Sequence, residues 1–325
     1  MSTIVFVHAH PDDEASGTAG SMARASDEGH RVVLVVATDG DHGTPAADLP
    51  DGRTVAEHRR EELAESARVL GVSRIAWLGY ADSGMTGWPQ NSAPNALMNV
   101  GVDEAARALA AVFDQEDADI VTGYDWHGGY GHPDHVMVHR IVRRAVELAA
   151  RRPRLLEVTM NRDAMRAMFR AAQAAGMDTE DWDPDGPADD GNPIGTPEDE
   201  IHLRVDVLPY LERKRAALQA HASQTSDVGV MLALPPAAFT AMFRDEYYLE
   251  PGREPGMRTG WIFEEEPAIV GALGEPAAVP GTVDLETQAD RIALVTHYAS
   301  SCSRTTMRRR ENGFRMRVDL PRPRV

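Results

Sequence analysis

Two short clusters of histidine and aspartate carry most of the chemistry that this sequence could perform. The first is HAHPDDE at residues 8–14, which directly follows the apolar run IVFV at 4–7. The second is YGHPDH at residues 130–135, again after an apparent strand at 119–122. Imidazole nitrogens and carboxylate oxygens suit a borderline metal ion such as Zn²⁺. Because each cluster contains a His-Pro-Asp step, the sequence predicts one metal site with ligands from both clusters.

The local geometry of the first cluster favours convergence of its side chains. Pro11 prevents the strand from continuing and forces a turn, so His10 and Asp13 are expected to point toward one place. Two ligands do not complete a site, and the second cluster is the best source of a third. These residues also have structural interpretations: Asp13 could cap a helix, and the second cluster could simply flank a helix start at Pro133.

The elements expected around the clusters alternate between strands and helices. Continuous apolar and β-branched runs predict buried strands, and apolar positions at helical spacing predict helices. Strands are expected at 4–7, 31–37, 75–78, 119–122, 155–160 and 201–207, and helices at 15–28, 54–70, 103–113, 136–150, 210–222 and 236–244. This alternation indicates βαβ units with right-handed crossovers. The predicted fold class is α/β, a Rossmann-like and mostly parallel sheet with helices on both faces.

Such a topology brings the two clusters together although they lie far apart in the sequence. In parallel sheets, ligands bind beyond the carboxyl ends of the strands. Both clusters fall at such ends, as do the loops 39–51 and 79–94. The acidic, Pro/Gly-rich stretch 178–200 is predicted to be a surface excursion. We therefore expect the active site at the carboxyl ends of the strands.

The composition narrows the class of protein. The 325-residue chain carries 51 acidic and 33 basic side chains and a net charge of −18, whereas nucleic-acid binding normally needs a basic face. The single cysteine, Cys302, excludes an intramolecular disulfide and a cysteine zinc site. No apolar run approaches the roughly 20 residues of a membrane span, and the N-terminus does not resemble a signal peptide. We expect a cytoplasmic protein that binds neither nucleic acid nor a membrane.

Taken together, the two clusters resemble those of the PIG-L/LmbE-like zinc-dependent de-N-acetylases. The similarity continues in WLGY at 77–80, DSGM at 82–85 and GGYG at 128–131, and more weakly in Lys214 and HASQ at 221–224. Within the family, the chain resembles in particular the branch of N-acetylglucosaminyl-inositol deacetylases and mycothiol S-conjugate amidases. The resemblance implies a deacetylase domain at 1–272 and a C-terminal extension at 273–325.

The resemblance also implies a ligand set and a base. His10, Asp13 and His135 would be the ligands of one Zn²⁺ per chain, for which Fe²⁺ could substitute. Open positions would remain for water and the amide oxygen. Asp12, next to a ligand, would be the general base that takes a proton from the attacking water.

Five further residues take roles from the same resemblance. His132 would stabilise the tetrahedral intermediate or protonate the leaving amine, and Asp134 would orient its imidazole. Tyr130 would donate a hydrogen bond to the developing oxyanion. Arg59 and Asp82 match positions with which the family holds the sugar. As structural alternatives, Asp134 could favour the dipole of a helix, and Arg59 could belong to a solvated helix face.

The implied function is a zinc-dependent hydrolase that removes the N-acetyl group from a small-molecule N-acetylglucosamine-type conjugate, giving acetate and a free aminosugar. A related alternative is an amidase that acts on a larger acyl amide, such as a mycothiol S-conjugate or an acylated natural product. An alternative from another class is a non-catalytic nucleotide- or sugar-binding Rossmann-like module. That module needs a glycine-rich phosphate loop after the first strand, where this chain has acidic residues. A homo-oligomer is compatible with the sequence.

Overall fold

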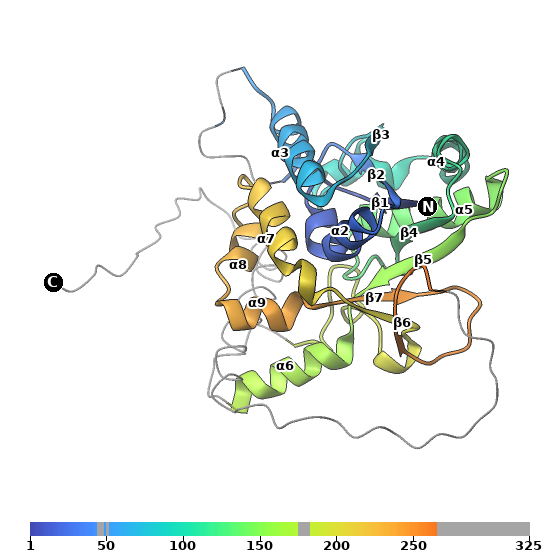
Figure 1. Cartoon of the computed structure of the whole chain (residues 1–325). Helices are drawn as coiled ribbons and strands as arrows, with labels where there is room; N and C mark the ends of the chain where they lie inside the picture. The colour runs from blue at the N-terminus through green and yellow to red at the C-terminus, as the bar shows by residue number, and fades with distance from the viewer. Residues whose placement is uncertain (44–48, 50–51, 175–182, 265–325) are drawn as a thin grey trace.

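An eight-stranded mixed sheet forms the centre of the protein (Figure 1). The computed structural model describes residues 1–43, 49, 52–174 and 183–264, so the domain boundary expected at 272/273 lies outside them. The strands are β1 (Thr3–His8), β2 (Arg31–Thr38), β3 (Arg74–Tyr80), β4 (Ile120–Tyr124), β5 (Arg154–Thr159), β6 (Leu203–Asp206), β7 (Asp245–Leu249) and β8 (Arg258–Thr259).

The order of the strands in the sheet is β3-β2-β1-β4-β5-β7-β6-β8. The first five strands in this order are parallel. β7 is antiparallel to both of its neighbours, and β8 is parallel to β6. The predicted α/β class with a mostly parallel sheet is therefore confirmed.

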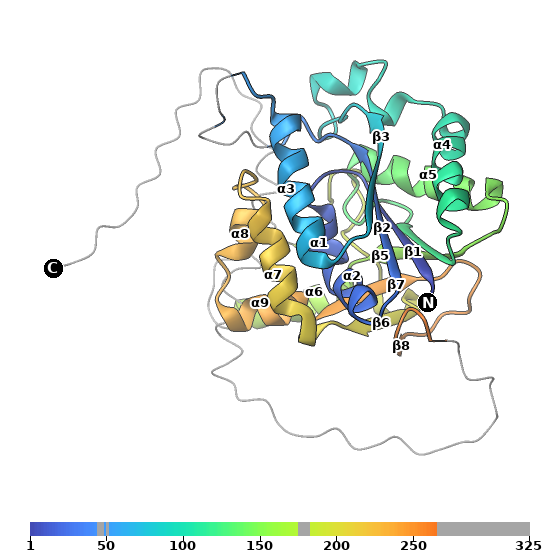
Figure 2. The ribbon, with the colours of Figure 1, turned by 45° about the horizontal axis from the view of Figure 1, so that its top comes forward.

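The side chains of the central strands alternate between two separate cores. Ile4 and Phe6 of β1 belong to one core, and Val5 and Val7 to the other, as the two-residue period of a strand requires. The first core is covered by α1 (Asp13–Gly17), α2 (Ala19–Asp27), α3 (Val55–Leu70), α7 (Leu211–Ala220), α8 (Val228–Leu232) and α9 (Pro236–Phe243). The second is covered by α4 (Val102–Glu116) and α5 (Pro133–Leu148). Figure 2 shows the parallel strands between these two groups, so helices cover both faces as predicted.

The helix expected at 15–28 is in fact two helices that meet at Thr18. Gly20 and Ser21, in the first turn of α2, each donate a backbone N–H at 2.9 Å to the carboxylate of Glu246. A negative charge there satisfies the free N–H groups and the dipole of a new helix N-terminus. Because this carboxylate comes from β7, the pattern around residue 18 could not predict the break.

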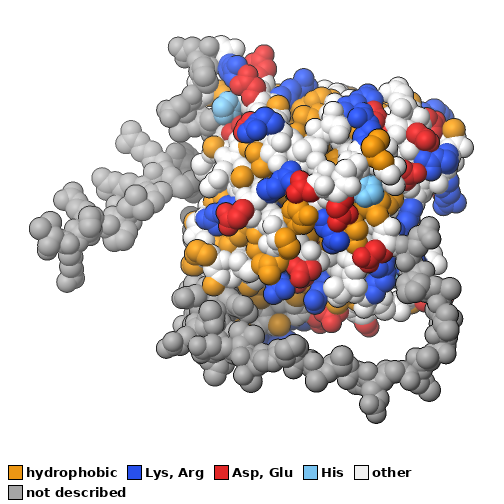
Figure 3. All heavy atoms as spheres, in the orientation of Figure 1, with side chains coloured by type: hydrophobic (Ala, Val, Ile, Leu, Met, Phe, Trp, Pro, Cys, Tyr) orange, Lys and Arg blue, Asp and Glu red, His pale blue; other side chains and the backbone are white. Residues whose placement is uncertain are grey.

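The remaining elements connect and border the sheet. They are α6 (Arg162–Ala174) and the short 3₁₀ helices η1 (Pro89–Ser92), η2 (Leu97–Asn99), η3 (Glu198–Glu200) and η4 (Leu208–Tyr210). Figure 3 shows acidic and basic side chains interspersed over one face of the molecule. In the described ranges, no helix combines the length and the apolarity that crossing a membrane would require.

A buried ion pair joins α7 to β7. Lys214, the only lysine of the sequence, places its Nζ 2.8 Å from Oε1 of Glu246, and each side chain is only 1% exposed. We expect Lys214→Met to lower the free energy of unfolding by about 3–5 kcal/mol, because it leaves a carboxylate buried without its counter-charge. Urea denaturation measures this. Arg68→Met, which breaks an exposed pair with Glu65, is the control, and an equally small change in both variants would contradict the expectation.

Candidate active site at the carboxyl ends of the strands

The two predicted clusters meet at the carboxyl ends of neighbouring strands. β1 and β4 are adjacent and parallel, and the first cluster follows β1 as the second follows β4. The imidazole of His10 lies 4.6 Å from that of His132 and 5.4 Å from that of His135, measured between ring centroids. The expectation that the topology brings the clusters together is confirmed.

Asp12 lies in a turn with an unusual backbone. Its φ of 112° and ψ of −25° fall in a region that non-glycine residues rarely adopt, which costs about 1–3 kcal/mol. The buried guanidinium of Arg59 holds this turn, since it donates to the carbonyl oxygens of Pro11 and Gly40. It also lies 2.9 Å from Oδ2 of Asp12. Burial raises the pKa of Asp12 to about 7 against the opposing charge of Arg59, and a carboxylate of that basicity exchanges protons readily near neutral pH.

Asp13 is held so that one carboxylate oxygen stays available. Its Oδ2 accepts hydrogen bonds from the backbone N–H of His10 at 2.8 Å and from the hydroxyl of Tyr124 at 2.7 Å. Its Oδ1 lies 3.4 Å from Nε2 of His135, a buried nitrogen without a hydrogen-bond partner among the described residues. Nδ1 of His135 lies 3.1 Å from the carbonyl oxygen of Gly128. That contact requires the proton on Nδ1 and leaves the lone pair on Nε2.

His10 presents a nitrogen to the other oxygen of Asp13, Oδ2. Its Nε2 lies 3.1 Å from Oδ2 of Asp134, and a proton held there leaves the lone pair on Nδ1. That Nδ1 lies 3.4 Å from the carboxylate of Asp13. Although burial opposes it, the surrounding carboxylates, above all that of Asp82, raise the pKa of His10 well above its usual value. The cluster therefore has a negative potential that favours a cation.

The prediction that Asp134 orients the imidazole of His132 is wrong. The carboxylate of Asp134 contacts His10 instead, and it accepts hydrogen bonds from the backbone N–H and the hydroxyl of Ser83. His132 caps α5, and its Nδ1 accepts the backbone N–H of Asp134 at 3.1 Å. Because this backbone group points back to the cap, the side chain of Asp134 is free to reach the end of β1.

His132 is better suited to donate a hydrogen bond than to bind a metal. Since its Nδ1 accepts a backbone N–H, the proton of the neutral ring must lie on Nε2. Burial, followed by the charges of His10 and His135, holds the pKa of His132 well below its usual value. The ring of Tyr130 packs edge-on against those of His132 and His135, with centroids 6.2 and 5.1 Å apart. Both residues predicted to act on the oxyanion thus lie beside His135.

These residues fit a divalent metal ion. Two sets of possible ligand atoms lie within 4.8 Å of one another among the described residues, those of His10, His132 and His135 and those of His10, Asp82 and Asp134. Asp13 belongs to neither set, and its place among the predicted ligands depends on its contacts with His10 and His135. Two ligands held tetrahedrally at 2.0–2.1 Å from Zn²⁺ are about 3.4 Å apart, which is the separation of Asp13 Oδ1 and His135 Nε2. A buried lone pair without a partner is unfavourable, and binding to a metal ion would satisfy it.

The two residues predicted to hold the sugar, Arg59 and Asp82, are both buried against the cluster. Oδ1 of Asp82 accepts the backbone N–H of Gly84 at 2.8 Å and lies 3.5 Å from Nε2 of His10. The charge of His10 lowers the pKa of Asp82 although burial opposes it. Arg59 contacts the turn at Asp12, so a group bound beside Asp12 and His10 would also lie near this pair.

Tyr124 is a site residue that the sequence analysis missed. Its ring is stacked on that of His135, with centroids 4.2 Å apart and planes inclined by 8°, while its hydroxyl binds Asp13. It therefore contacts two predicted metal ligands, one at the start of α1 and one at the start of α5. The signal that could have revealed it is a tyrosine at the carboxyl end of the strand that precedes the second cluster.

We expect Tyr124→Phe to weaken metal binding by about 10–100-fold, the usual effect of losing a hydrogen bond that orients a ligand. The phenylalanine ring keeps the stack on His135 and removes the hydroxyl that donates to Asp13 and accepts the backbone N–H of Ala9. Competition with a chromophoric chelator measures the affinity for Zn²⁺. Tyr248→Phe is the matched control, since it removes a buried hydroxyl that contacts Ser21 rather than the cluster. An unchanged affinity in Tyr124→Phe would refute the orienting role.

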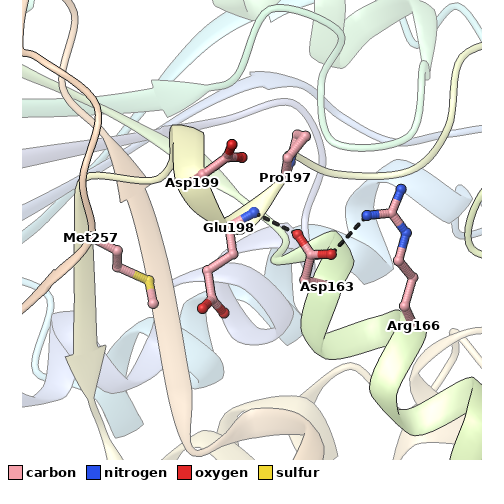
Figure 4. A pocket seen from close by; sticks show the side chains of 6 residues that line it. All are labelled: Asp163, Arg166, Pro197, Glu198, Asp199 and Met257. Carbon is pink, nitrogen blue, oxygen red and sulfur yellow. Dashed lines mark hydrogen bonds and ion pairs between the residues drawn. The ribbon is translucent and has the colours of Figure 1, made fainter.

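A separate surface hollow lies near the N-terminus of α6 (Figure 4). It is lined by Asp163, Arg166, Pro197, Glu198, Asp199 and Met257. Asp163 accepts the backbone N–H of Glu198 and pairs with Arg166. These polar groups of the hollow are therefore engaged with each other. No predicted site residue lines this hollow, and we assign the chemistry to the histidine cluster.

The fold and the cluster together define a class of protein. At the carboxyl ends of the strands, His10 Nδ1 and His135 Nε2 each lie 3.4 Å from an oxygen of the Asp13 carboxylate, and the carboxylate of the adjacent residue, Asp12, lies next to them. Imidazole and carboxylate groups placed in this way beside an acid of raised pKa are typical of the catalytic metal sites of hydrolases. This class is that of the metal-dependent hydrolases.

Comparison with known proteins narrows the class to a family. The family described as GlcNAc-PI de-N-acetylase (PIG-L) matches residues 5–146. A 1D-myo-inositol 2-acetamido-2-deoxy-alpha-D-glucopyranoside deacetylase from Thermobifida fusca is 35% identical over 274 residues, which cover 78% of this chain and 94% of that protein. A protein of the same name from Saccharomonospora viridis is 39% identical and covers 68% and 84%, respectively. The solved structure of the A40926 pseudoaglycone deacetylase Dbv21 shares the fold, with a TM-score of 0.51, 16% identity and coverage of 76% and 96%.

The chain belongs to the PIG-L de-N-acetylase family. The prediction of an amide hydrolase of the de-N-acetylase type is therefore confirmed. All nine residues predicted for the site lie within the matched residues 5–146.

Proposed function

We propose that this protein is a zinc-dependent de-N-acetylase that hydrolyses the acetamido group of an N-acetylglucosamine conjugate and releases acetate and a free aminosugar. The observation that carries the proposal is the buried Nε2 of His135, which has no hydrogen-bond partner among the described residues and lies 3.4 Å from Oδ1 of Asp13, beside Asp12. With Nδ1 of His10 they form a ligand set of two nitrogens and one oxygen. Zn²⁺ suits this set, and Fe²⁺ is the alternative metal.

Three residues of the chain would hold the metal ion, and Asp12 would take a proton from the attacking water. A divalent ion bound to His10, Asp13 and His135 supplies Lewis-acid polarisation and lowers the pKa of water. Asp12 accepts the proton of the attacking water, because its raised pKa matches neutral pH. Arg59 keeps the carboxylate of Asp12 in place. The same proton is then available for the amine that leaves.

The neighbouring donors would act on the carbonyl oxygen of the acetamide. His132 offers an Nε2–H, since its ring is neutral and its Nδ1 is already an acceptor. Tyr130, packed against His132 and His135, would offer its hydroxyl. Fixed donors aimed at a developing oxyanion stabilise the transition state more than the ground state, which is the role we give to both residues.

The substrate class follows from the relatives. Those of highest identity reported above are named for an inositol-linked 2-acetamido-2-deoxyglucopyranoside. We infer a glucosaminide of this kind for the present chain, with the sugar held near Arg59 and Asp82. The alternative substrate is an amide with a larger acyl group, for which the loops around the site would have to leave room.

A panel of amides distinguishes these substrates. Release of primary amine should be fastest from an inositol-linked N-acetylglucosaminide, slower from free N-acetylglucosamine, and slowest when acetyl is replaced by longer acyl groups on the same glycoside. Mass spectrometry of the products identifies the acid released. Cleavage of only the longer acyl amides would overturn the acetyl specificity while leaving the amide hydrolase in place.

A further inference from the structure

Glu14 is a completely buried carboxylate that the proposed reaction does not use. It belongs to α1, and its side chain is 0% exposed. Its Oε1 accepts hydrogen bonds from the hydroxyl of Ser66 in α3, at 2.5 Å, and pairs at 2.7 Å with Nε2 of His221, the C-terminal cap of α7. His221 is likewise 0% exposed. Burying such a pair is unfavourable unless further hydrogen bonds satisfy it, so its position calls for an explanation.

The other oxygen of Glu14 contacts the backbone of the proposed base. Oε2 accepts the N–H of Asp12 at 3.0 Å. This is the residue whose φ of 112° is strained, and residues keep such a conformation only where the surroundings impose it. Arg59 fixes the carboxylate of Asp12 and the carbonyl before it, whereas Glu14 fixes its N–H. The two contacts hold the turn from opposite ends.

We propose that Glu14, itself held by Ser66 and His221, is a positioning residue that keeps Asp12 in its left-handed conformation and so directs the carboxylate of Asp12 at the substrate water. The inference rests on the proposed function of Asp12 as the base. It also gives a role to His221, from the HASQ segment at 221–224, which lies outside the matched range 5–146. His221, in the second half of the chain, thereby helps to position Asp12, the proposed base in the first half.

The substitutions Glu14→Ala and Glu14→Gln separate positioning from simple packing. Glutamine can still accept the N–H of Asp12 through its carbonyl oxygen, and its amide can donate to a neutral His221 and to Ser66. Alanine can do neither. We expect Glu14→Ala to lower kcat about 100-fold, the effect of a small misplacement of a reacting group, with KM and metal content unchanged. Glu14→Gln should restore kcat to within about tenfold of the wild type, since hydrogen-bond geometry is kept.

Three controls make the test decisive. Tyr248→Phe loses a buried hydrogen bond under α2 without touching Asp12, and it should lower Tm but not kcat of the folded enzyme. In an Asp12→Ala background, Glu14→Ala should cause no further loss of kcat. If Glu14→Ala does not fold, Ser66→Ala and His221→Gln remove the supports of Glu14 one at a time and should lower kcat in the same sense.

The crystal structure of Glu14→Ala gives a readout that does not need activity. The proposal requires φ of Asp12 to relax to a negative value in that variant. A φ that stays positive, or a kcat per folded molecule equal to that of the wild type, would overturn the proposal. If the wild type released no amine from any substrate, the proposed function would fail, and the φ of Asp12 would still decide whether Glu14 positions it.

Discussion

Replacing Asp12 with asparagine should lower kcat by about 10²–10⁴-fold, the contribution of a general base, and leave the bound metal in place. Asparagine has the size of aspartate and can still accept the hydrogen bond from Arg59. It lacks the basic oxygen that takes the proton of water. The measurements are kcat on an N-acetylglucosaminide and metal content by elemental analysis of the same preparation.

The control for Asp12→Asn is a substitution of the same kind at an exposed aspartate. Asp27→Asn removes an exposed acid of α2 that pairs with Arg213 on the surface, and it should leave kcat unchanged. Loss of metal from Asp12→Asn would make Asp12 a ligand rather than a base. Turnover at the wild-type rate would make it a solvated acid of the turn.

His135→Ala should remove or severely weaken metal binding. The substitution deletes the buried Nε2 that has no hydrogen-bond partner among the described residues and faces Asp13. Loss of a ligand should exceed the 10–100-fold that the loss of an orienting partner costs. Chelator competition measures the affinity, and circular dichroism shows whether the variant is folded.

Two histidines serve as comparisons for His135→Ala. His30, which stacks on Phe263 and directly precedes β2, lies at the amino end of that strand, away from the carboxyl ends that carry the cluster, and His30→Ala should keep full metal affinity. His132→Ala should also keep the metal but lose kcat, because His132 is assigned as a donor. Undiminished zinc in His135→Ala, or loss of zinc in His132→Ala, would contradict the ligand set.

The position of the site could be predicted because it depends on short-range patterns and one rule of topology. Each His-Pro-Asp step follows an apolar run, and parallel strands bring their carboxyl ends to one edge. Phe6 pairs with Thr122, and this register alone brings the two clusters side by side. The positions of the strands and the right-handed connections between them are enough to predict that the two clusters are neighbours.

The contacts within the site could not be predicted, because they join residues far apart in the sequence through side-chain directions. Asp134 reaches His10 rather than its neighbour His132, because the start of α5 turns the backbone of Asp134 toward the cap. The hydroxyl of Tyr124, at the end of β4, binds Asp13 at the start of α1. Local sequence specifies neither contact.

The same limit explains the misassigned helix at 15–28. Its pattern of small residues suits one continuous helix, but Glu246 from β7 binds the backbone at Gly20 and Ser21 and starts a second one. The break also places α1 so that Glu14 meets Ser66 and His221. Tertiary contacts of this kind override local propensity.

The most direct test of the central claim is metal-dependent release of primary amine from an inositol-linked N-acetylglucosaminide. The wild-type protein is assayed after loading with Zn²⁺, after removal of the metal by a chelator, and after Zn²⁺ is returned. The cluster of His10, Asp13 and His135 beside Asp12 predicts amine and acetate in equal amounts, loss of both on chelation, and recovery on reloading. Equal rates with and without metal would contradict it, as would a zinc-loaded protein that cleaves no amide of the panel.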